Sequence, residues 1–249
     1  MSALGRAILR LAACVALRGK TLAGENVYDS RIEAVDFPDG VAIAGSIAVR
    51  SEQDEGDALS HQNGGPPFVP EVELVLEISM QARLGQDDGT YVVGVPETDD
   101  ELEMSLDIME TQAEIALFRS FATAAVGFRA VAKRAKSKGS IRFTDPKASE
   151  KYAARYVVYK IEVDDPEIDI HDQVATGLAR LPEPFRSVAL AWPNGSVEKA
   201  KALALAALLT ETPPPAFERT VSTIPPPPST QTPGTTPNPS RVETWTLQQ

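Results

Sequence analysis

The positions of hydrophobic and polar residues follow two different spacings along this chain. Near the N-terminus, apolar residues recur every three or four positions from Leu4 to Val15, with arginines between them. This spacing predicts an amphipathic helix over residues 2–18. Gly19 directly follows and is placed to end that helix.

A second helical pattern begins at "TDDE", residues 98–101, which has the spacing of a capping box. Its apolar stripe runs from Leu102 to Ala116 and then loses its period, which predicts a break or bend before the helix ends near Lys136. The basic segment "KRAKSKGSIR", residues 133–142, is then expected to be a helix C-terminus, where cations interact favourably with the helix dipole.

Three further segments are predicted to be strands, in which successive side chains point to opposite faces. These segments are residues 41–50, 71–84 and 151–163. The first is apolar on both faces, bulky on one and small on the other, which favours a central place in a sheet. The second is apolar on one face and rich in glutamate on the other, and the third is expected to pair beside it.

Charged residues on these strands predict a cross-strand ion pair. If the last strand lies beside the second, Lys160 or Arg155 is expected to face a glutamate there. The candidate partners are Glu73 and Glu77, on the polar face of that strand. Such a pair contributes about 0.2–1 kcal/mol to stability.

Two polar segments lie between these elements. "GENVYDSRIEAVDF", residues 24–37, is a short extended segment that carries an aromatic residue, acids and an arginine. Residues 51–70 are acidic and then rich in glycine and proline, which predicts a long projecting loop. His61 lies in this loop with no second ligand at metal-binding spacing, so we expect a solvated histidine.

Together these elements predict an α+β fold with a mostly antiparallel or mixed sheet of about four strands packed by helices. We expect residues 1–165 to form this domain. Residues 166–212 are expected to add a helical segment packed on it, with Asp172 and Ser196 as helix N-caps. Residues 213–249 are expected to form a proline-rich extended tail.

The C-terminal tail has a composition that does not build a core. It holds ten of the 20 prolines of the chain, and its last eight residues, "VETWTLQQ", regain apolar side chains. We predict that Val242, Trp245 and Leu247 form a docking peptide that adds to the sheet of a neighbour. The alternative is a frayed terminus.

The charge of the chain narrows its class of partner. A formal net charge of -11 argues against non-specific binding to phosphate backbones.

Cys14 is the only cysteine, so no internal disulfide is expected. Arg6 and Arg10 interrupt the apolar stretch that a signal peptide needs before Cys14, and no run approaches the roughly 18 apolar residues of a membrane span. We expect a soluble protein that is not exported and binds no membrane.

One segment is crowded with groups that catalysis uses. "VDDPEIDIHD", residues 163–172, holds several acids and His171. Such a set can bind a divalent cation or serve as acid and base, but it also suits a strand-to-helix junction in an acidic chain. The sequence carries no phosphate loop, GxSxG turn or HExxH motif. We therefore expect that the chain is not an enzyme and that it has no catalytic residue, no metal-binding residue and no cofactor. A metal-dependent hydrolase using Asp169 and His171 is the alternative, and an adaptor with a proline-rich tail is a third class.

The order of elements and one motif resemble a known family. "LRGKTLAGENVYDSR", residues 17–31, follows an amphipathic helix and precedes an alternating strand, an acidic loop, a strong strand, a capped helix and a last strand. This arrangement resembles the tail terminator and tail completion proteins of tailed bacteriophages and related gene transfer agents. The residues that carry the resemblance are Leu17, Thr21, Gly24, Val27, Tyr28, Asp29, Ser30 and Arg31. It covers roughly residues 3–165.

The resemblance implies a structural protein of the virion. Such proteins form a ring, typically a hexamer, at the head-proximal end of the tail tube, end tube polymerisation and join the tail to the neck. The implied partners are further copies of the chain, the tail tube protein and neck or connector proteins, and DNA passes through the lumen without sequence-specific binding. The implied location is the head–tail junction of the virion, after assembly in the host cytoplasm. A head–tail connector or neck protein is the alternative within this class.

Within such a ring, Tyr28, Asp29 and Arg31 are candidate subunit-interface residues. They lie on an edge-like segment whose polar groups a neighbouring subunit is able to satisfy. The alternative is an intrachain salt bridge with a packed tyrosine.

Overall fold

The structure is a computed structural model. It describes residues 3–30, 43–58, 68–85, 91–94, 100–144, 151–164, 166 and 175–209. The chain divides into two compact units, Met1–Pro214 and Pro215–Gln249, and every described residue belongs to the first. The predicted docking residues Val242, Trp245 and Leu247 therefore lie outside the described residues.

The described helices and strands follow the α+β class that the sequence predicts. In chain order they are α1 (Ala3–Leu17), β1 (Val27–Asp29), β2 (Ile43–Ala58), β3 (Phe68–Gly85), β4 (Tyr91–Gly94), α2 (Asp100–Glu114), a π-helical turn (Ile115–Arg119), α3 (Thr123–Val131), β5 (Ala132–Thr144), β6 (Lys151–Val163), a 3₁₀ turn (Gly177–Arg180), α4 (Phe185–Leu190) and α5 (Val197–Leu208). The helix predicted over residues 2–18 and the strand predicted over 151–163 are confirmed as α1 and β6.

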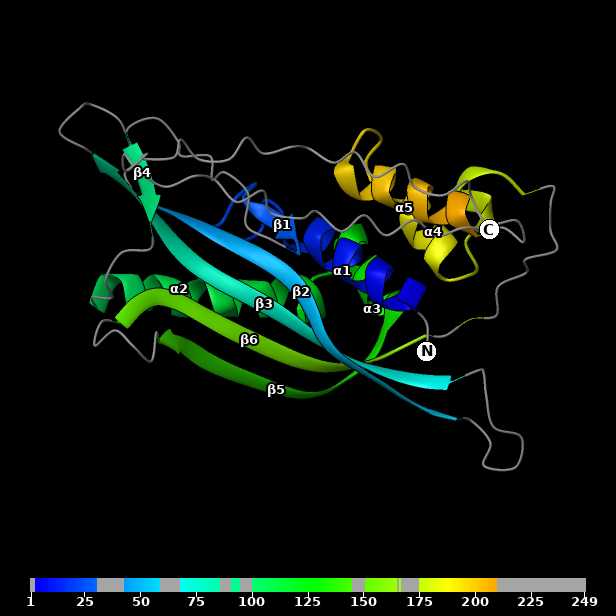
Figure 1. Cartoon of the computed structure of the whole chain (residues 1–249), viewed down its shortest axis with the longest axis horizontal. Coiled ribbons are helices and arrows are strands. Elements are labelled where there is room, and N and C mark those ends of the chain that lie inside the picture. The colour runs from blue at the N-terminus through cyan, green and yellow to red at the C-terminus, as the bar shows by residue number, and fades with distance from the viewer. Residues whose placement is uncertain are drawn as a thin grey trace, which may run out of the picture. The chain divides into compact units, whose positions relative to one another are not determined.

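The strands form one mixed sheet in the order β1-β2-β3-β6-β5, with β4 paired to β3 (Figure 1). β1 runs parallel to β2, and the other described pairs are antiparallel. The sheet has six strands where about four were expected, but β1 and β4 contribute only three and four residues. The central position predicted for the strand over residues 41–50 is confirmed, because β2 lies between β1 and β3.

The side chains of the central strands alternate between two faces of the sheet. In the pairing register, Ile47 of β2 lies opposite Ile78 of β3, and Leu76 lies opposite Val157 of β6. These four side chains are fully buried and share one hydrophobic cluster with residues of α1, α2 and α3. In Figure 1, α2 lies behind β3 and β6. We call this the helix-covered face and the other the open face.

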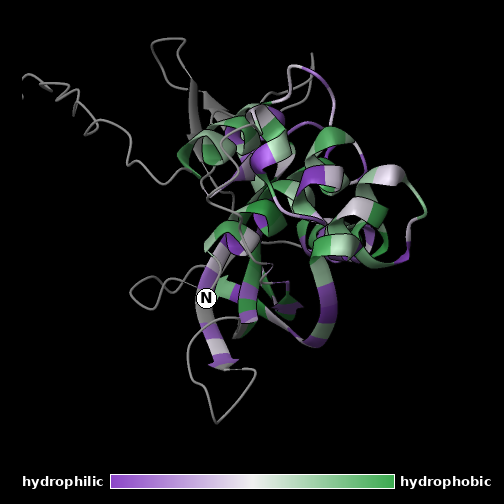
Figure 2. Cartoon of the chain, turned by 90° about the vertical axis from the view of Figure 1, so that its right-hand side faces the viewer, coloured by the Kyte–Doolittle hydropathy of each residue, from purple (hydrophilic) through white to green (hydrophobic). Residues whose placement is uncertain are grey.

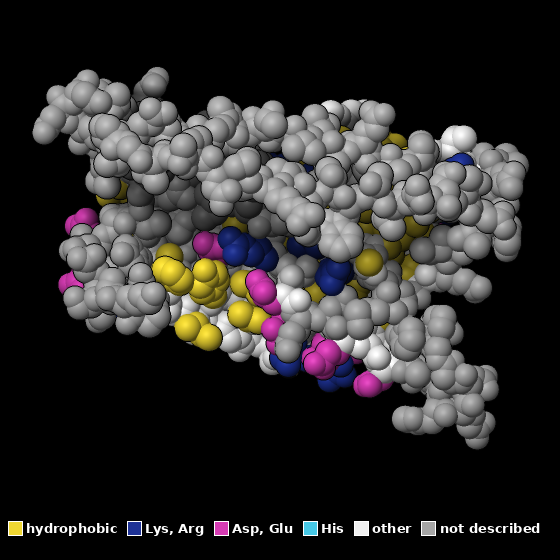
Figure 3. Space-filling model, viewed as in Figure 1, with side chains coloured by type: hydrophobic (Ala, Val, Ile, Leu, Met, Phe, Trp, Pro, Cys, Tyr) yellow, Lys and Arg dark blue, Asp and Glu magenta, His cyan; other side chains and the backbone are white. Residues whose placement is uncertain are grey.

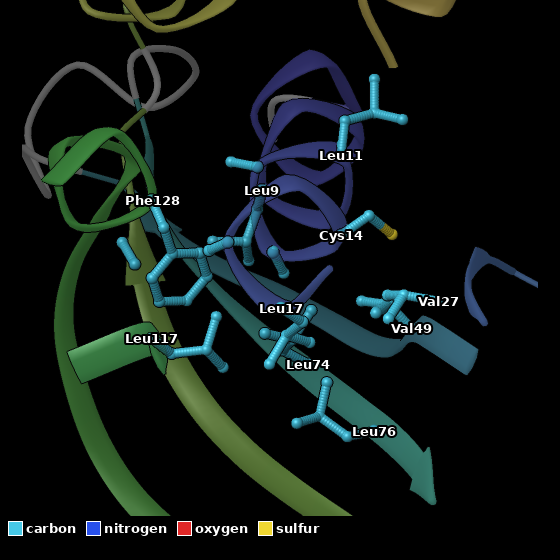
Figure 4. Close-up of a cluster of buried hydrophobic side chains, with 14 of the residues drawn as sticks. Leu9, Leu11, Cys14, Leu17, Val27, Val49, Leu74, Leu76, Leu117 and Phe128 are labelled. Carbon is cyan, nitrogen blue, oxygen red and sulfur yellow. The ribbon is translucent and has the colours of Figure 1, made fainter. Parts of the chain in front are cut away.

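The core lies between the helix-covered face and the helices. Figure 4 shows Leu9 of α1 pointing toward Phe128 of α3, and Val27 of β1 beside Val49 of β2. Along the helices, hydrophobic and hydrophilic residues interchange, as expected for elements that bury one side (Figure 2). Gly45 of β2 allows close approach of α2, since a Cβ there would lie 2.8 Å from the Met109 sulfur.

The basic segment 133–142 is not a helix end, so this prediction is wrong. Helix α3 ends at Val131 and the basic residues form β5 at the edge of the sheet. Two register shifts, at Ala132/Arg134 and Ala135/Ser137, interrupt the period of two at its start. Because each bulge inserts an extra residue, the alternation that identifies a strand is hidden there.

The predicted loop over residues 51–70 is also shorter than expected. β2 continues to Ala58 and β3 begins at Phe68, so the two strands form a long hairpin with a register shift between Ser51 and Asp54. The acidic residues hid this strand because they show no apolar alternation, although cross-strand hydrogen bonds need only the backbone. Residues 59–67, with His61, lie outside the described residues.

The C-terminal helices of this unit differ from the expectation. A helix was predicted to begin at Asp172, which lies outside the described residues. Over the described residues that follow, this prediction is wrong, because Gly177–Arg180 forms a single 3₁₀ turn. Ser196 is confirmed as the N-cap of α5, because its hydroxyl accepts a hydrogen bond from the Lys199 backbone N–H at 3.2 Å. Both α4 and α5 contact α1, and residues of both join the common core.

Cys14 lies on the buried side of α1 and has no exposed surface. Burial raises the pKa of its thiol, so it stays protonated and out of reach of solvent. We expect a thiol reagent at mildly alkaline pH to label the folded protein about 100-fold more slowly than the protein in concentrated guanidinium chloride. Since Cys14 is the only cysteine, the absorbance of the released thiolate reports on this residue alone. Rapid labelling of the native protein would contradict the buried position.

Candidate functional site

The motif that carries the family resemblance forms a tight connection between α1 and β1. Gly24 has a φ of +57°, in the left-handed region that glycine adopts without strain. Its N–H donates to the Thr21 carbonyl at 2.9 Å, and its own carbonyl accepts from the Gly19 N–H at 2.8 Å. Thr21 and Gly24 therefore determine the turn that delivers β1 to the edge of β2.

Asp29, at the end of β1, joins three elements. Its Oδ1 accepts from Arg10 Nε of α1 at 2.9 Å, and its Oδ2 accepts from Lys201 Nζ of α5 at 2.8 Å. Burial alone would raise the pKa of this carboxyl, but the hydrogen bonds from Lys201 and Arg10 outweigh it and lower the pKa. The intrachain salt bridge, which the sequence left open as the alternative, is present.

Of the other two candidate interface residues, the structure describes Tyr28 but not Arg31. The Tyr28 hydroxyl donates to Asn26 Oδ1 at 3.0 Å, and its side chain is half-buried. Arg31 lies outside the described residues. A role of Tyr28, Asp29 and Arg31 between subunits stays a prediction.

A second ion pair next to this motif was not found by sequence reasoning. Arg18, at the end of α1, donates from Nη1 and Nη2 to the two carboxylate oxygens of Glu198 in α5, at 2.9 and 2.8 Å. Its Nη2 also donates to the Val27 carbonyl of β1 at 2.9 Å. The Glu198 side chain is 3% exposed, so this bidentate pair fastens α5 to α1 and β1 in a buried position.

The acids of α2 form a row that faces basic residues of β5 and β6. The row consists of Glu103, Asp107, Glu110 and Glu114. Arg155 of β6 lies 3.1 Å from both Glu103 Oε2 and Glu110 Oε2 and also pairs with Asp107. Lys138 of β5 lies 2.8 Å from Glu110 Oε1. These contacts hold α2 on the helix-covered face, which assigns part of the basic segment a structural role.

The predicted cross-strand ion pair is confirmed for one of its two basic candidates. Lys160 lies opposite Glu73 in the register, with 3.4 Å between Nζ and Oε1. Arg155 lies opposite Ile78 and turns to the helix-covered face, so it does not pair with Glu77. Glu77 instead meets Arg50 of β2, with 2.6 Å between Oε2 and Nη2.

The open face carries an exposed apolar group at the end nearest β5. Ile141 is 64% exposed and Phe143 is 38% exposed. The Phe143 ring packs edge-on against Tyr156 of β6, with 5.7 Å between ring centroids. Figure 3 shows hydrophobic side chains gathered beside basic and acidic ones over the strands on this side. We call Ile141, Phe143 and Tyr156 the open-face patch.

Comparison with known proteins does not assign this surface, because no family model, no curated protein and no solved structure matches the chain. Among the described residues, no three or more His, Cys, Asp and Glu side chains are placed to hold a metal ion. Of the acidic segment 163–172, only residues 163, 164 and 166 are described, and Asp164 forms an ion pair with Lys133. No described helix is long and apolar enough to cross a membrane.

The contacts of Asp29 predict a pH-dependent contribution to stability. We expect Asp29→Asn to lower the free energy of unfolding by about 1–2 kcal/mol at neutral pH, because two charged hydrogen bonds are weakened. The pKa of this carboxyl is lowered from 3.8 in the folded protein, so its contribution is complete above that value and is lost as the pH falls through the folded-state pKa. Urea denaturation of both proteins at several pH values should show their difference shrinking in acid. A difference that stays constant down to the lowest pH would contradict this prediction.

Proposed function

We propose that this chain is a structural protein of a tailed phage or gene transfer particle. In this proposal it forms a ring at the head-proximal end of the tail tube, ends tube polymerisation and joins the tail to the neck. Its activity then lies in surfaces between protein subunits, and no bond is made or broken.

The open face is the observation that carries this proposal. The open-face patch places exposed aromatic and aliphatic side chains next to ion pairs such as Arg50–Glu77. Protein–protein interfaces combine these features, with aromatic residues and arginine enriched at their centre. The helix-covered face already holds the helices and the core, and the centre of the open face is buried as well, since Ser46, Ala48 and Ser79 are at most 1% exposed. Among the described residues, the side chains of the open face that a neighbouring subunit is able to reach lie at its β5 end, at Ile141 and Phe143.

The arrangement along the chain supports the same proposal. The amphipathic helix, the motif loop and the strands β2, β3 and β6 follow one another in the order on which the family resemblance rests. Asp29 and Gly24 of the motif hold the connection between α1 and β1. These motif residues therefore stabilise the fold of the subunit. In this proposal, contacts with a neighbouring subunit are made by motif groups that remain exposed at the surface.

The proposal is tested by co-expressing the chain with its cognate tail tube protein. The tubes are imaged by negative-stain electron microscopy with a gold label on this chain. We expect label in a ring at one end of tubes of limited length. Tubes of uncontrolled length without label would exclude a terminator. Label that attaches to isolated portal or neck complexes and never to tubes would favour the connector alternative.

A further inference from the structure

β5 lies at one margin of the sheet and presents a backbone edge there. Among the described residues it pairs only with β6, and in Figure 1 no described strand lies beyond it. The pairing runs without a register shift from Ser137 to Arg142, and residues 137–141 are all exposed. No described residue outside β6 forms a backbone hydrogen bond with this section. Because alternate residues of a strand direct their N–H and C=O groups to the same side, about three residues here present these groups to a partner. We call the section Ser137–Arg142 the free edge.

The basic side chains of the free edge do not protect it against pairing. Edge strands commonly avoid the addition of another strand through lysines and bulges. Lys138 lies 2.8 Å from Glu110 Oε1, and Arg142 Nη2 lies 2.6 Å from Glu103 Oε2, so both cations are held against α2 on the helix-covered face. The register shifts of β5 lie outside the free edge, at its two ends. The free edge therefore remains open to a further strand.

The open face beside the free edge offers apolar contacts and space. Ile141 and Phe143 of the open-face patch lie on this face, and Gly139 shares it because side chains alternate along a strand. A Cβ at Gly139 would meet no atom within 4 Å. Glycine within a strand often marks a place where another chain approaches closely, and an aromatic ring on the next strand is able to cover it. A strand with large apolar side chains at alternate positions matches this surface.

We propose that residues 242–247 of a second copy of the chain add to the free edge as a further strand. These residues, "VETWTL", are six in number like those of the free edge and include valine, threonine and tryptophan, which favour strands. Backbone hydrogen bonds supply the affinity of such an added strand, and its alternate side chains supply the specificity. The inference rests on the proposed ring for the identity of the partner as a second copy.

The distribution of side chains along the peptide determines which of its sides meets the open face. Trp245 and Leu247 are two positions apart, so they lie on one side of a strand, and Glu243 lies on that side as well. With this side on the open face, both apolar residues reach the open-face patch. The opposite orientation would bring Glu243 to the side of the sheet that holds Glu110 and Glu114 of α2, where like charges repel.

The position of α5 favours docking on a neighbour over docking on the same chain. α5 packs on α1 and is tied to the β1 margin, where Lys201 Nζ donates to Asp29 Oδ2 at 2.8 Å. β1 and β5 are the opposite margins of the sheet. The residues between Leu209 and Val242 are able to span roughly 100 Å at about 3.1 Å per residue, which is enough to reach a neighbour. A donor near one margin and an acceptor at the other give a head-to-tail contact, and such contacts close into rings.

Hydrogen–deuterium exchange of the full-length chain tests whether the peptide occupies the free edge. The wild type is compared at equal concentration with Trp245→Ser and with the conservative variant Trp245→Phe. We expect the amides of residues 137–142 to exchange about tenfold faster in Trp245→Ser, and Trp245→Phe to keep most of the protection. Position 245 belongs to the second compact unit, so the amides of α1 should exchange equally in all three proteins.

Cross-linking then identifies which chain donates the peptide. A copy with Ser137→Cys and one affinity tag is co-expressed with a copy that has another tag and either Glu243→Cys or Gln248→Cys, so that both strand directions are tested. A short bismaleimide should give a product that carries both tags, and Cys14 does not compete because it is buried. Met104→Cys is the control for Ser137→Cys. It lies 65% exposed on α2 and should give about tenfold less product.

Two results would overturn this inference. Equal exchange of residues 137–142 in the wild type and Trp245→Ser would show that the peptide does not occupy the free edge. Protection without a product that carries both tags would show that each peptide docks on its own chain. Neither measurement involves tail tubes. A labelled ring at the tube ends together with an unprotected free edge would refute this contact alone, whereas protection and cross-linking without label on the tubes would refute the proposed terminator alone.

Discussion

Ile141→Lys is expected to prevent ring assembly and leave the subunit folded. Ile141 is 64% exposed, so its replacement should change the free energy of unfolding by no more than about 0.5 kcal/mol. In an assembled ring, burying this side chain contributes about 1.5–3 kcal/mol, and a lysine in its place has to be desolvated. The dissociation constant between subunits should therefore rise by about 100-fold or more. Analytical ultracentrifugation of the purified chain, with urea denaturation, measures both quantities.

Met104→Lys is the matched control for this prediction. Met104 is 65% exposed on α2, which packs on the helix-covered face, and lysine is as good a helix former as methionine. We expect this variant to assemble as the wild type does. If Ile141→Lys assembles normally, or if both variants fail, the open-face patch is not the assembly surface.

Glu198→Ala is expected to cost about 3 kcal/mol of unfolding free energy, because it leaves the Arg18 guanidinium partly buried without its carboxylate partner. The remaining acceptor is the Val27 carbonyl, and Glu25 approaches Arg18 only to 3.9 Å. Urea denaturation should show a lower midpoint with an unchanged slope. The loss should extend to α5, which Glu198 ties to α1 and β1.

Two further variants separate the buried pair from an ordinary surface charge. Glu183→Ala breaks an ion pair with Arg186 in which the glutamate side chain is 48% exposed, and it should cost less than about 1 kcal/mol. The double variant Arg18→Met/Glu198→Leu removes both buried charges and should recover most of the loss. Equal losses in Glu198→Ala and Glu183→Ala would contradict a special role for the buried pair.

The strands with a regular pattern were predictable, and those with interrupted patterns were not. Residues 151–163 form β6 with the predicted bounds, and β6 pairs with β3 without a register shift. β5 escaped prediction because three register shifts interrupt its pairing with β6 and because Lys138, in its basic run, pairs with acids on α2. A lysine that faces a helix across the sheet cannot be distinguished, in the sequence, from a lysine at a helix end.

The candidate sites depend still more on contacts between distant parts of the chain. The motif drew attention to Asp29, but nothing in the sequence links it to Lys201, which is 172 positions away. The same holds for Arg18 and Glu198, which are 180 positions apart. A depression on the surface likewise brings Arg50 of β2 beside Arg6 and Arg10 of α1. Periodicity predicts which face of an element is buried, whereas these side chains find their partners through the packing of whole elements.

The long hairpin of β2 and β3 has an inner section and an outer section that should differ in their stability against local unfolding. β6 pairs with β3 only from Glu71 onward, whereas the hairpin continues outward through Gly56↔Pro70 to Ala58↔Phe68. Among the described residues this outer section has two strands and no third, and two-stranded ribbons are marginal in water. Its amide hydrogens should therefore exchange with deuterium through local fraying, while those of the inner section wait for the whole sheet to unfold. A partner that binds the outer section would then slow the hydrogen exchange of these amides.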